Sequence, residues 1–134
     1  MEKIKIGFIS LGCPKNQVDT EVMLSLLDKA GYELTGDEKE ADVIVINTCA
    51  FIESAKRESI DSILDVAELK KHGNLKGIVV CGCMAQRYAD EIESELPEVD
   101  AIVGTGSIRE IVKSVESVAR GERFRSVKPN EELE

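Results

Sequence analysis

The chain has 134 residues, of which 43% are hydrophobic and 32% are charged, a balance that is typical of one globular domain and excludes a disordered chain. Its net charge of −9 at pH 7 argues against direct nucleic-acid binding, because nucleic-acid-binding modules neutralise phosphates with basic residues. The apolar runs are shorter than the roughly 20 residues that span a bilayer, and no secretory signal is recognisable, so we expect a cytoplasmic protein without a membrane partner.

The first part of the chain alternates apolar runs with amphipathic stretches. Residues 4–9 predict a strand, and residues 19–30 predict a helix with apolar side chains on one face. Gly31 is expected to end this helix, because glycine readily adopts the left-handed conformation found there. A short strand is expected over residues 32–35. The continuous β-branched run over residues 43–46 is typical of a strand that is covered on both faces.

The same alternation continues through the second part of the chain. We expect a long helix from about residue 52 to about residue 71, followed by a strand over residues 78–80. A helix over residues 85–96 and a strand over residues 101–103 come next. The last predicted helix begins at Ser107, which would cap it, and reaches residue 119 or 120.

This order of elements predicts an α/β fold. Strands that alternate with helices form a parallel sheet with helices on both faces. Five strands favour a flavodoxin-like, doubly wound sheet with the strand order 2-1-3-4-5. We expect residues 1–121 to form the domain, and residues 122–134 to form a short strand or linker with a tail.

Four cysteines carry the main chemical signal, and in a reducing compartment they indicate thiols or metal ligands rather than disulfides. Cys13 follows the first predicted strand, Cys49 the third, and Cys81 and Cys83 the fourth. These three strands are neighbours in the expected order, so their following loops can converge on one point. Three thiolates at one point indicate a soft metal or an iron–sulfur cluster. A [4Fe–4S] cluster held by three cysteines leaves one iron open.

Cys81 and Cys83 compete for one ligand position. Cys81 continues the strand and can pack there, whereas Cys83 follows Gly82, where the backbone can turn freely. We therefore favour Cys83 as the ligand. A simpler interpretation stays open, in which the cysteines are small buried apolar side chains.

Two other kinds of site also remain open. Cys81 and Arg87 have the Cys-x5-Arg spacing of a cysteine-dependent phosphatase or arsenate reductase, in which a thiolate attacks and the arginine holds oxygens. A zinc or redox module would use Cys81 or His72 as a fourth ligand.

Several motifs surround the cysteines. They are Leu11-Gly12-Cys13-Pro14-Lys15-Asn16, Val18-Asp19-Thr20-Glu21, Asn47-Thr48-Cys49-Ala50-Phe51-Ile52 and Gly82-Cys83. Together they resemble the N-terminal domain of the radical-SAM methylthiotransferases, and the resemblance covers nearly the whole chain. It implies that Cys13, Cys49 and Cys83 bind an auxiliary [4Fe–4S] cluster, whose open iron binds the sulfur species to be transferred. Cys81 has no counterpart in the family motif.

The resemblance also implies a substrate. Pro14 and Lys15 are similar to the branch of the family that methylthiolates an aspartate of a small-subunit ribosomal protein, whereas the tRNA-modifying branch usually has glutamine and methionine there. The net charge of −9 suits a basic ribosomal protein, and a tRNA adenosine stays the alternative substrate.

One part of the family pattern is absent from this sequence. The Cys-x3-Cys-x2-Cys motif, which binds a second [4Fe–4S] cluster and S-adenosylmethionine, does not occur, and neither does the C-terminal domain. We therefore expect this chain to be one domain of a transferase. It would act with its own radical-SAM and C-terminal domains and be inactive alone.

Overall fold

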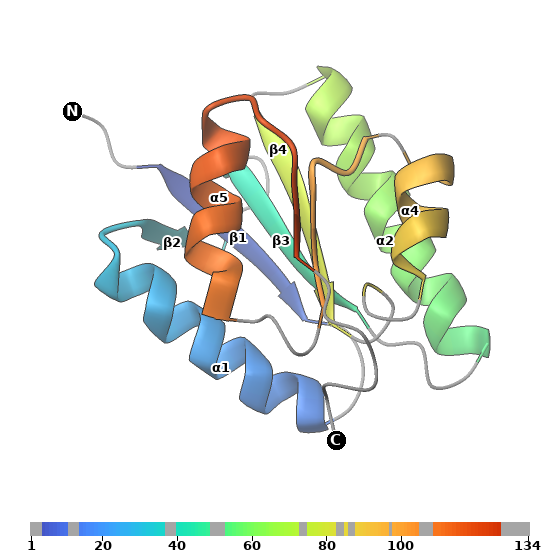
Figure 1. Ribbon diagram of the computed structural model, residues 1–134, viewed down its shortest axis with the longest axis horizontal. Coiled ribbons are helices and arrows are strands. Elements are labelled where there is room, and N and C mark those ends of the chain that lie inside the picture. The colour runs from blue at the N-terminus through green and yellow to red at the C-terminus, as the bar shows by residue number, and fades with distance from the viewer. Residues whose placement is uncertain are drawn as a thin grey trace.

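A parallel β-sheet forms the centre of the computed structural model, which describes residues 4–10, 14–36, 40–48, 53–72, 75–82, 85, 88–96, 98–104 and 109–126 (Figure 1). Within these residues the strands are β1 (Lys5–Ser10), β2 (Glu33–Thr35), β3 (Val43–Thr48), β4 (Gly77–Gly82), β5 (Ala101–Val103) and β6 (Phe124–Ser126). They pair in parallel in the order β2-β1-β3-β4-β5-β6. The parallel sheet and the order of its first five strands confirm the prediction.

The number of strands differs from the prediction, because the described part of the chain contains six strands and not five. β6 pairs with β5 at the edge of the sheet, with Phe124 opposite Ala101. It comes from the stretch in which the sequence predicts a short strand or linker. Its three residues are polar or only partly buried, so they lack the apolar run that marks the inner strands. The fold is broadly flavodoxin-like with one added edge strand.

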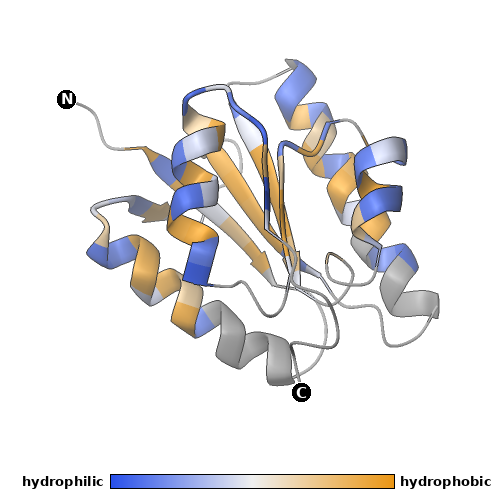
Figure 2. Cartoon of the chain, in the orientation of Figure 1, coloured by the Kyte–Doolittle hydropathy of each residue, from blue (hydrophilic) through white to orange (hydrophobic). Residues whose placement is uncertain are grey.

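Helices cover both faces of the sheet (Figure 1). On one face lie α1 (Pro14–Lys29) and α5 (Ile111–Ala119), and on the other lie α2 (Glu53–His72) and α4 (Ala89–Glu95). Figure 2 shows that the central strands are mostly hydrophobic, whereas the helices also carry hydrophilic residues. None of the helices in the described residues is long and apolar enough to cross a membrane.

The core lies on the two faces of β3 and β4, whose residues are all buried. Side chains alternate between the faces: Val43 and Val45 pack toward α1 and α5, whereas Ile44 and Ile46 pack toward α2 and α4. This arrangement confirms that the β-branched run is a strand covered on both faces.

The starts of three helices can be compared with the predicted ones. α1 begins at Pro14, earlier than predicted, because proline lacks only an N–H group that the first turn of a helix leaves unpaired. α4 begins at Ala89, and Ala85, where the predicted helix starts, is itself helical and buried, whereas residues 86–87 between them lie outside the described residues. α5 begins at Ile111, and the predicted cap Ser107 lies outside the described residues. The end of α1 matches the prediction, since Gly31 follows it with φ +94°.

Ion pairs connect the last strands to the neighbouring helices. Lys70 of α2 binds Asp100, with 2.7 Å between Nζ and Oδ2, and the same carboxylate oxygen accepts a hydrogen bond from the N–H of Ile78. Arg125 of β6 binds two carboxylates of α4, on the residues Asp90 and Glu93. Hydrogen bonds to these carboxylates, first to Asp90 and then to Glu93, raise the pKa of Arg125 above its ordinary value.

Candidate functional site

The carboxyl ends of β1, β3 and β4 lie side by side, and we call this place, defined by Ser10, Thr48 and Gly82, the cysteine end of the sheet (Figure 1). Ser10 of β1 is paired with Asn47 of β3, and Asn47 is paired with Cys81 of β4. Thr48 is paired with Gly82 one residue further along. β3 and β4 therefore end at the same level, and β1 ends one residue before them.

The three expected cluster ligands follow these strand ends in the sequence. Cys49 comes directly after β3, Cys83 comes directly after β4, and Cys13 directly precedes Pro14, the first residue of α1. Cys13, Cys49 and Cys83 all lie outside the described residues. Their role as ligands therefore stays a prediction, whereas the adjacency of the strands that precede them is confirmed.

A buried hydrogen bond joins the ends of β3 and β4. The hydroxyl of Thr48 donates to the backbone carbonyl of Cys81, with 2.6 Å between the oxygens. Asn47, the neighbour of Thr48, is also buried. Two buried polar residues thus end a strand whose other residues are apolar.

Gly82 lies against these two residues at the end of β4. Its φ is +96°, a conformation that residues with a β carbon rarely adopt. A β carbon at this position would lie 2.5 Å from Oδ1 of Asn47 and 2.9 Å from the backbone nitrogen of Thr48. Glycine therefore allows β4 to turn here in contact with β3 without the strain and steric overlap that a β carbon would add.

Cys81 packs in the core, as expected from its position within the strand. Its side chain is fully buried, and its sulfur lies 3.7 Å from the sulfur of Met23 on α1. A nucleophile must be reached by its substrate, so this burial argues against the phosphatase or arsenate reductase interpretation. Arg87, the other residue of that interpretation, lies outside the described residues.

The residues considered for a metal site lie mostly outside the part of the chain that the structure describes. Among the described residues, no three His, Cys, Asp or Glu side chains are grouped so that they could hold a metal ion. The side chain of His72 and three of the four cysteines are not among the described groups. The zinc interpretation with Cys81 as fourth ligand would need the thiol to leave its contact with Met23.

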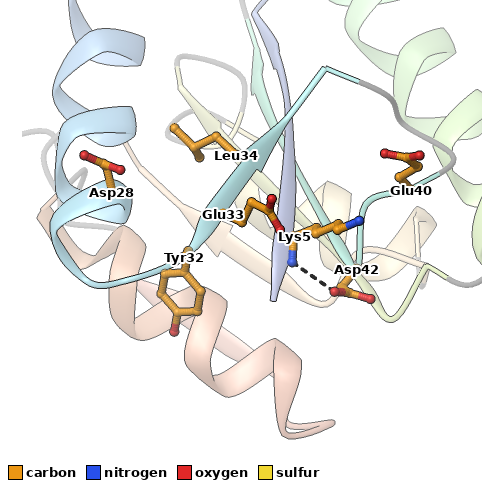
Figure 3. Close-up of a pocket in the computed structure, with 7 residues that line it drawn as sticks. All are labelled: Lys5, Asp28, Tyr32, Glu33, Leu34, Glu40 and Asp42. Atoms are coloured by element: carbon orange, nitrogen blue, oxygen red, sulfur yellow. Dashed lines mark hydrogen bonds between the residues drawn. The ribbon is translucent and has the colours of Figure 1, made fainter. Parts of the chain in front are cut away.

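A pocket of about 700 Å³ lies at the opposite end of the sheet, near the starts of β1 and β2 (Figure 3). Its lining is polar and mostly acidic: Lys5, Asp28, Tyr32, Glu33, Leu34, Glu40 and Asp42. The backbone N–H of Lys5 donates to Oδ2 of Asp42 at 2.9 Å, and the N–H of Asp42 donates back to the carbonyl of Lys5 at 2.7 Å. Because ligands of open parallel sheets bind at the carboxyl ends of strands, we place the candidate site at the cysteine end and not in this pocket.

Tyr32 lines the same pocket and has a shifted pKa. Burial of its ring raises the pKa above 10.0, because burial penalises the phenolate. The nearby charge of Glu116 raises it further, whereas Arg120 lowers it.

Asn47 and Thr48 belong to one of the motifs that the sequence shares with the family, but no role was expected for their side chains. The available signal was their position, since two polar residues directly follow the apolar run of β3. Because buried polar groups are usually hydrogen-bonded, this position indicates a hydrogen bond such as the one that Thr48 donates.

Comparisons with known proteins connect this chain to one family. Residues 5–104 match the family described as "Uncharacterized protein family UPF0004". The ribosomal protein uS12 methylthiotransferase RimO of Lachnoclostridium phytofermentans is 58% identical over 93% of this chain and 28% of its own length. The protein of the same name from Clostridioides difficile is 58% identical over 87% of this chain and 26% of its own length. The protein of the same name from Geobacter sulfurreducens is 52% identical over 93% of this chain and 28% of its own length. The chain thus spans little more than a quarter of these relatives.

Proposed function

Because the chain belongs to the UPF0004 family and matches the N-terminal domain of RimO-like methylthiotransferases, we propose that it holds the auxiliary [4Fe–4S] cluster of such an enzyme. The proposed ligands are Cys13, Cys49 and Cys83. The observation that carries this proposal is the common level at which β1, β3 and β4 end. These are the strands that the three cysteines follow in the sequence.

The residues at the cysteine end fit a group of this kind. Thiolates are the ligands that iron–sulfur clusters require. Cys13 directly precedes α1, whose positive N-terminal end favours a thiolate over a thiol. The close contact of Gly82 with Asn47 and Thr48 brings the ends of β3 and β4 together without an intervening side chain.

Under this proposal, this chain and the rest of the protein bind different cofactors. When bound, the cluster supplies one iron atom with a free coordination position. The three thiolates anchor it to the ends of three neighbouring strands, and the buried thiol of Cys81 takes no part. The second cluster and S-adenosylmethionine would be bound by a radical-SAM domain outside this sequence, so the chain alone would not carry out the transfer.

We further propose that the whole enzyme modifies a small-subunit ribosomal protein in the cytoplasm. The matched relatives are named for ribosomal protein uS12. Pro14 and Lys15 follow the pattern of that branch, and an acidic domain suits a basic protein substrate. The test compares an aspartate-containing ribosomal protein with tRNA as substrates of the whole enzyme. Equal or faster methylthiolation of a tRNA adenosine would assign the enzyme to the tRNA-modifying branch.

Four single cysteine-to-alanine variants test the cluster proposal. We expect Cys13→Ala, Cys49→Ala and Cys83→Ala to lose most of their iron and sulfide after anaerobic reconstitution, because each removes one of only three anchors. Cys81→Ala is the matched control and should load like the unaltered chain. Loss of iron in Cys81→Ala with full loading of Cys83→Ala would exchange the two assignments. Full loading of all four variants would contradict the three-cysteine site.

A further inference from the structure

We propose that Thr48 is a positioning residue for the cluster site. Its hydroxyl, bound to the carbonyl of Cys81, holds the ends of β3 and β4 in one register, from which the chain continues to Cys49 and Cys83. This rests on the proposed function, since it assigns Thr48 a role in a site that those cysteines form.

The hydrogen bond from Thr48 lies at the ends of β3 and β4. Thr48 and Gly82 are the last residues of β3 and β4 and are paired with each other. Gly82 has φ +96°, which is not a strand conformation, so the regular backbone ladder cannot continue past it. The Thr48 hydroxyl adds a side-chain bond between the two strands at the place where the ladder stops.

The hydrogen bond between Thr48 and Cys81 is buried and short. Thr48 and Cys81 are both fully buried, and the 2.6 Å between Oγ1 and the carbonyl oxygen is within the normal range for a hydroxyl donor. A hydrogen bond is stronger in a buried environment than in water, and the carbonyl would be costly to leave without it. The bond therefore resists separation of the two strand ends.

Two of the proposed ligands are joined by one peptide bond each to the paired strand ends. A trans peptide bond keeps each next Cα about 3.8 Å from the preceding one. Cys49 directly follows Thr48 and Cys83 directly follows Gly82 in the sequence, so the hydrogen-bonded strand ends lie one residue before each proposed ligand. Metal ligands must be held at set separations, so a looser pair of strand ends would hold the cluster less well.

A purely structural role for Thr48 makes a different prediction, and Ser114 offers the matched control. Ser114 is also fully buried, and its hydroxyl donates to the carbonyl of Ile111 at 2.7 Å. This bond lies within the first turn of α5 and joins no two strands. If Thr48 serves stability alone, removal of either hydroxyl should affect the cluster equally.

The experiment compares the unaltered chain with Thr48→Val, Thr48→Ser and Ser114→Ala. Thermal unfolding of the metal-free protein measures stability. Iron content, the electron paramagnetic resonance spectrum of the reduced cluster and the rate of iron release to a chelator measure the site. We expect Thr48→Val to release iron about tenfold faster and to change the spectrum, as loss of a buried hydrogen bond of this kind would do. Thr48→Ser should restore both properties, and Ser114→Ala should change only stability.

Each outcome separates the two proposals. If the unaltered chain binds no iron, the proposed function fails and this inference fails with it. If the unaltered chain loads and Thr48→Val has the same spectrum and release rate, only the positioning role of Thr48 is overturned. Should Thr48→Val not fold, Thr48→Ala removes the same hydroxyl with a smaller side chain. Failure of both to fold while Ser114→Ala folds would assign Thr48 to folding and overturn the inference.

Discussion

Gly82 and Asn47 are packed so closely that a β carbon on Gly82 would lie 2.5 Å from the side-chain oxygen of Asn47. We expect Gly82→Ala to lower the free energy of unfolding by about 2–4 kcal/mol, because it adds a steric overlap to the strain of a positive φ. Gly121→Ala is the control, since Gly121 has φ +82° but no described atom within 4 Å of the position that a β carbon would take. Gly121→Ala should lower the free energy of unfolding, measured in urea, by only about 1 kcal/mol. Equal losses in the two variants would contradict the contact at Gly82.

Cys81 should be chemically protected although it is a thiol. Its side chain is fully buried beside Met23, so an alkylating reagent can reach it only when the core opens. In a chain with Cys13, Cys49 and Cys83 replaced by alanine, we expect alkylation of Cys81 to be slow and to accelerate in denaturant. Mass spectrometry measures the rate. Alkylation as fast as that of a small free thiol would contradict the burial, and Cys81→Ala should cost only on the order of 1 kcal/mol.

The carboxylate of Asp100 should contribute more to stability than surface acids do. It binds Lys70 and accepts the N–H of Ile78, and its side chain is only 20% exposed. We expect Asp100→Ala to lower the free energy of unfolding by about 1–3 kcal/mol, because it leaves the Ile78 N–H and the Lys70 ammonium without this partner. Glu110→Ala removes a partly exposed carboxylate 3.6 Å from the exposed Lys113 and should change stability by less than about 0.5 kcal/mol. Urea unfolding measures both variants, and similar losses in the free energy of unfolding would contradict this ranking.

Tyr32 should titrate above pH 10 in the folded protein. Because its folded pKa is raised, chiefly by burial and then by Glu116, the neutral phenol is favoured by folding. Its contribution to stability is complete below pH 10 and is lost as the pH rises through the folded pKa. Phenolate absorbance in a Tyr88→Phe background measures this, since the chain has only two tyrosines. Glu116→Gln should move the titration to lower pH, and a titration at or below pH 10 in the parent would contradict the shift.

The inner strands were predictable because their residues are apolar and β-branched. Val43 to Ile46 are buried on both faces, and no other element satisfies such a run as well as a central parallel strand. β6 shows no such run, since Phe124, Arg125 and Ser126 form one short, partly exposed edge strand. Its place depends on pairing with β5 and on the contacts of Arg125 with α4, which are tertiary interactions.

The candidate site was predictable to a different extent. Strand order alone places the ends of β1, β3 and β4 together, because parallel strands with helical connections all end at one side of the sheet. The packing of Cys81 also follows from its position within β4. The hydrogen bond from Thr48 and the close contact at Gly82 were not predictable, since both depend on the register of β3 against β4.

The strand order has a consequence for how the protein is made. β2 joins one side of β1, β3 joins the other side, and each later strand joins the strand synthesised just before it. None of the six described strands has to insert between two that are already paired, so the sheet can grow outward while synthesis continues. β1, β3 and β4 are all available once residue 82 has been added, before β5 and β6 exist. The cysteine end can thus take shape during translation, ahead of the strand that finally closes the far edge of the sheet.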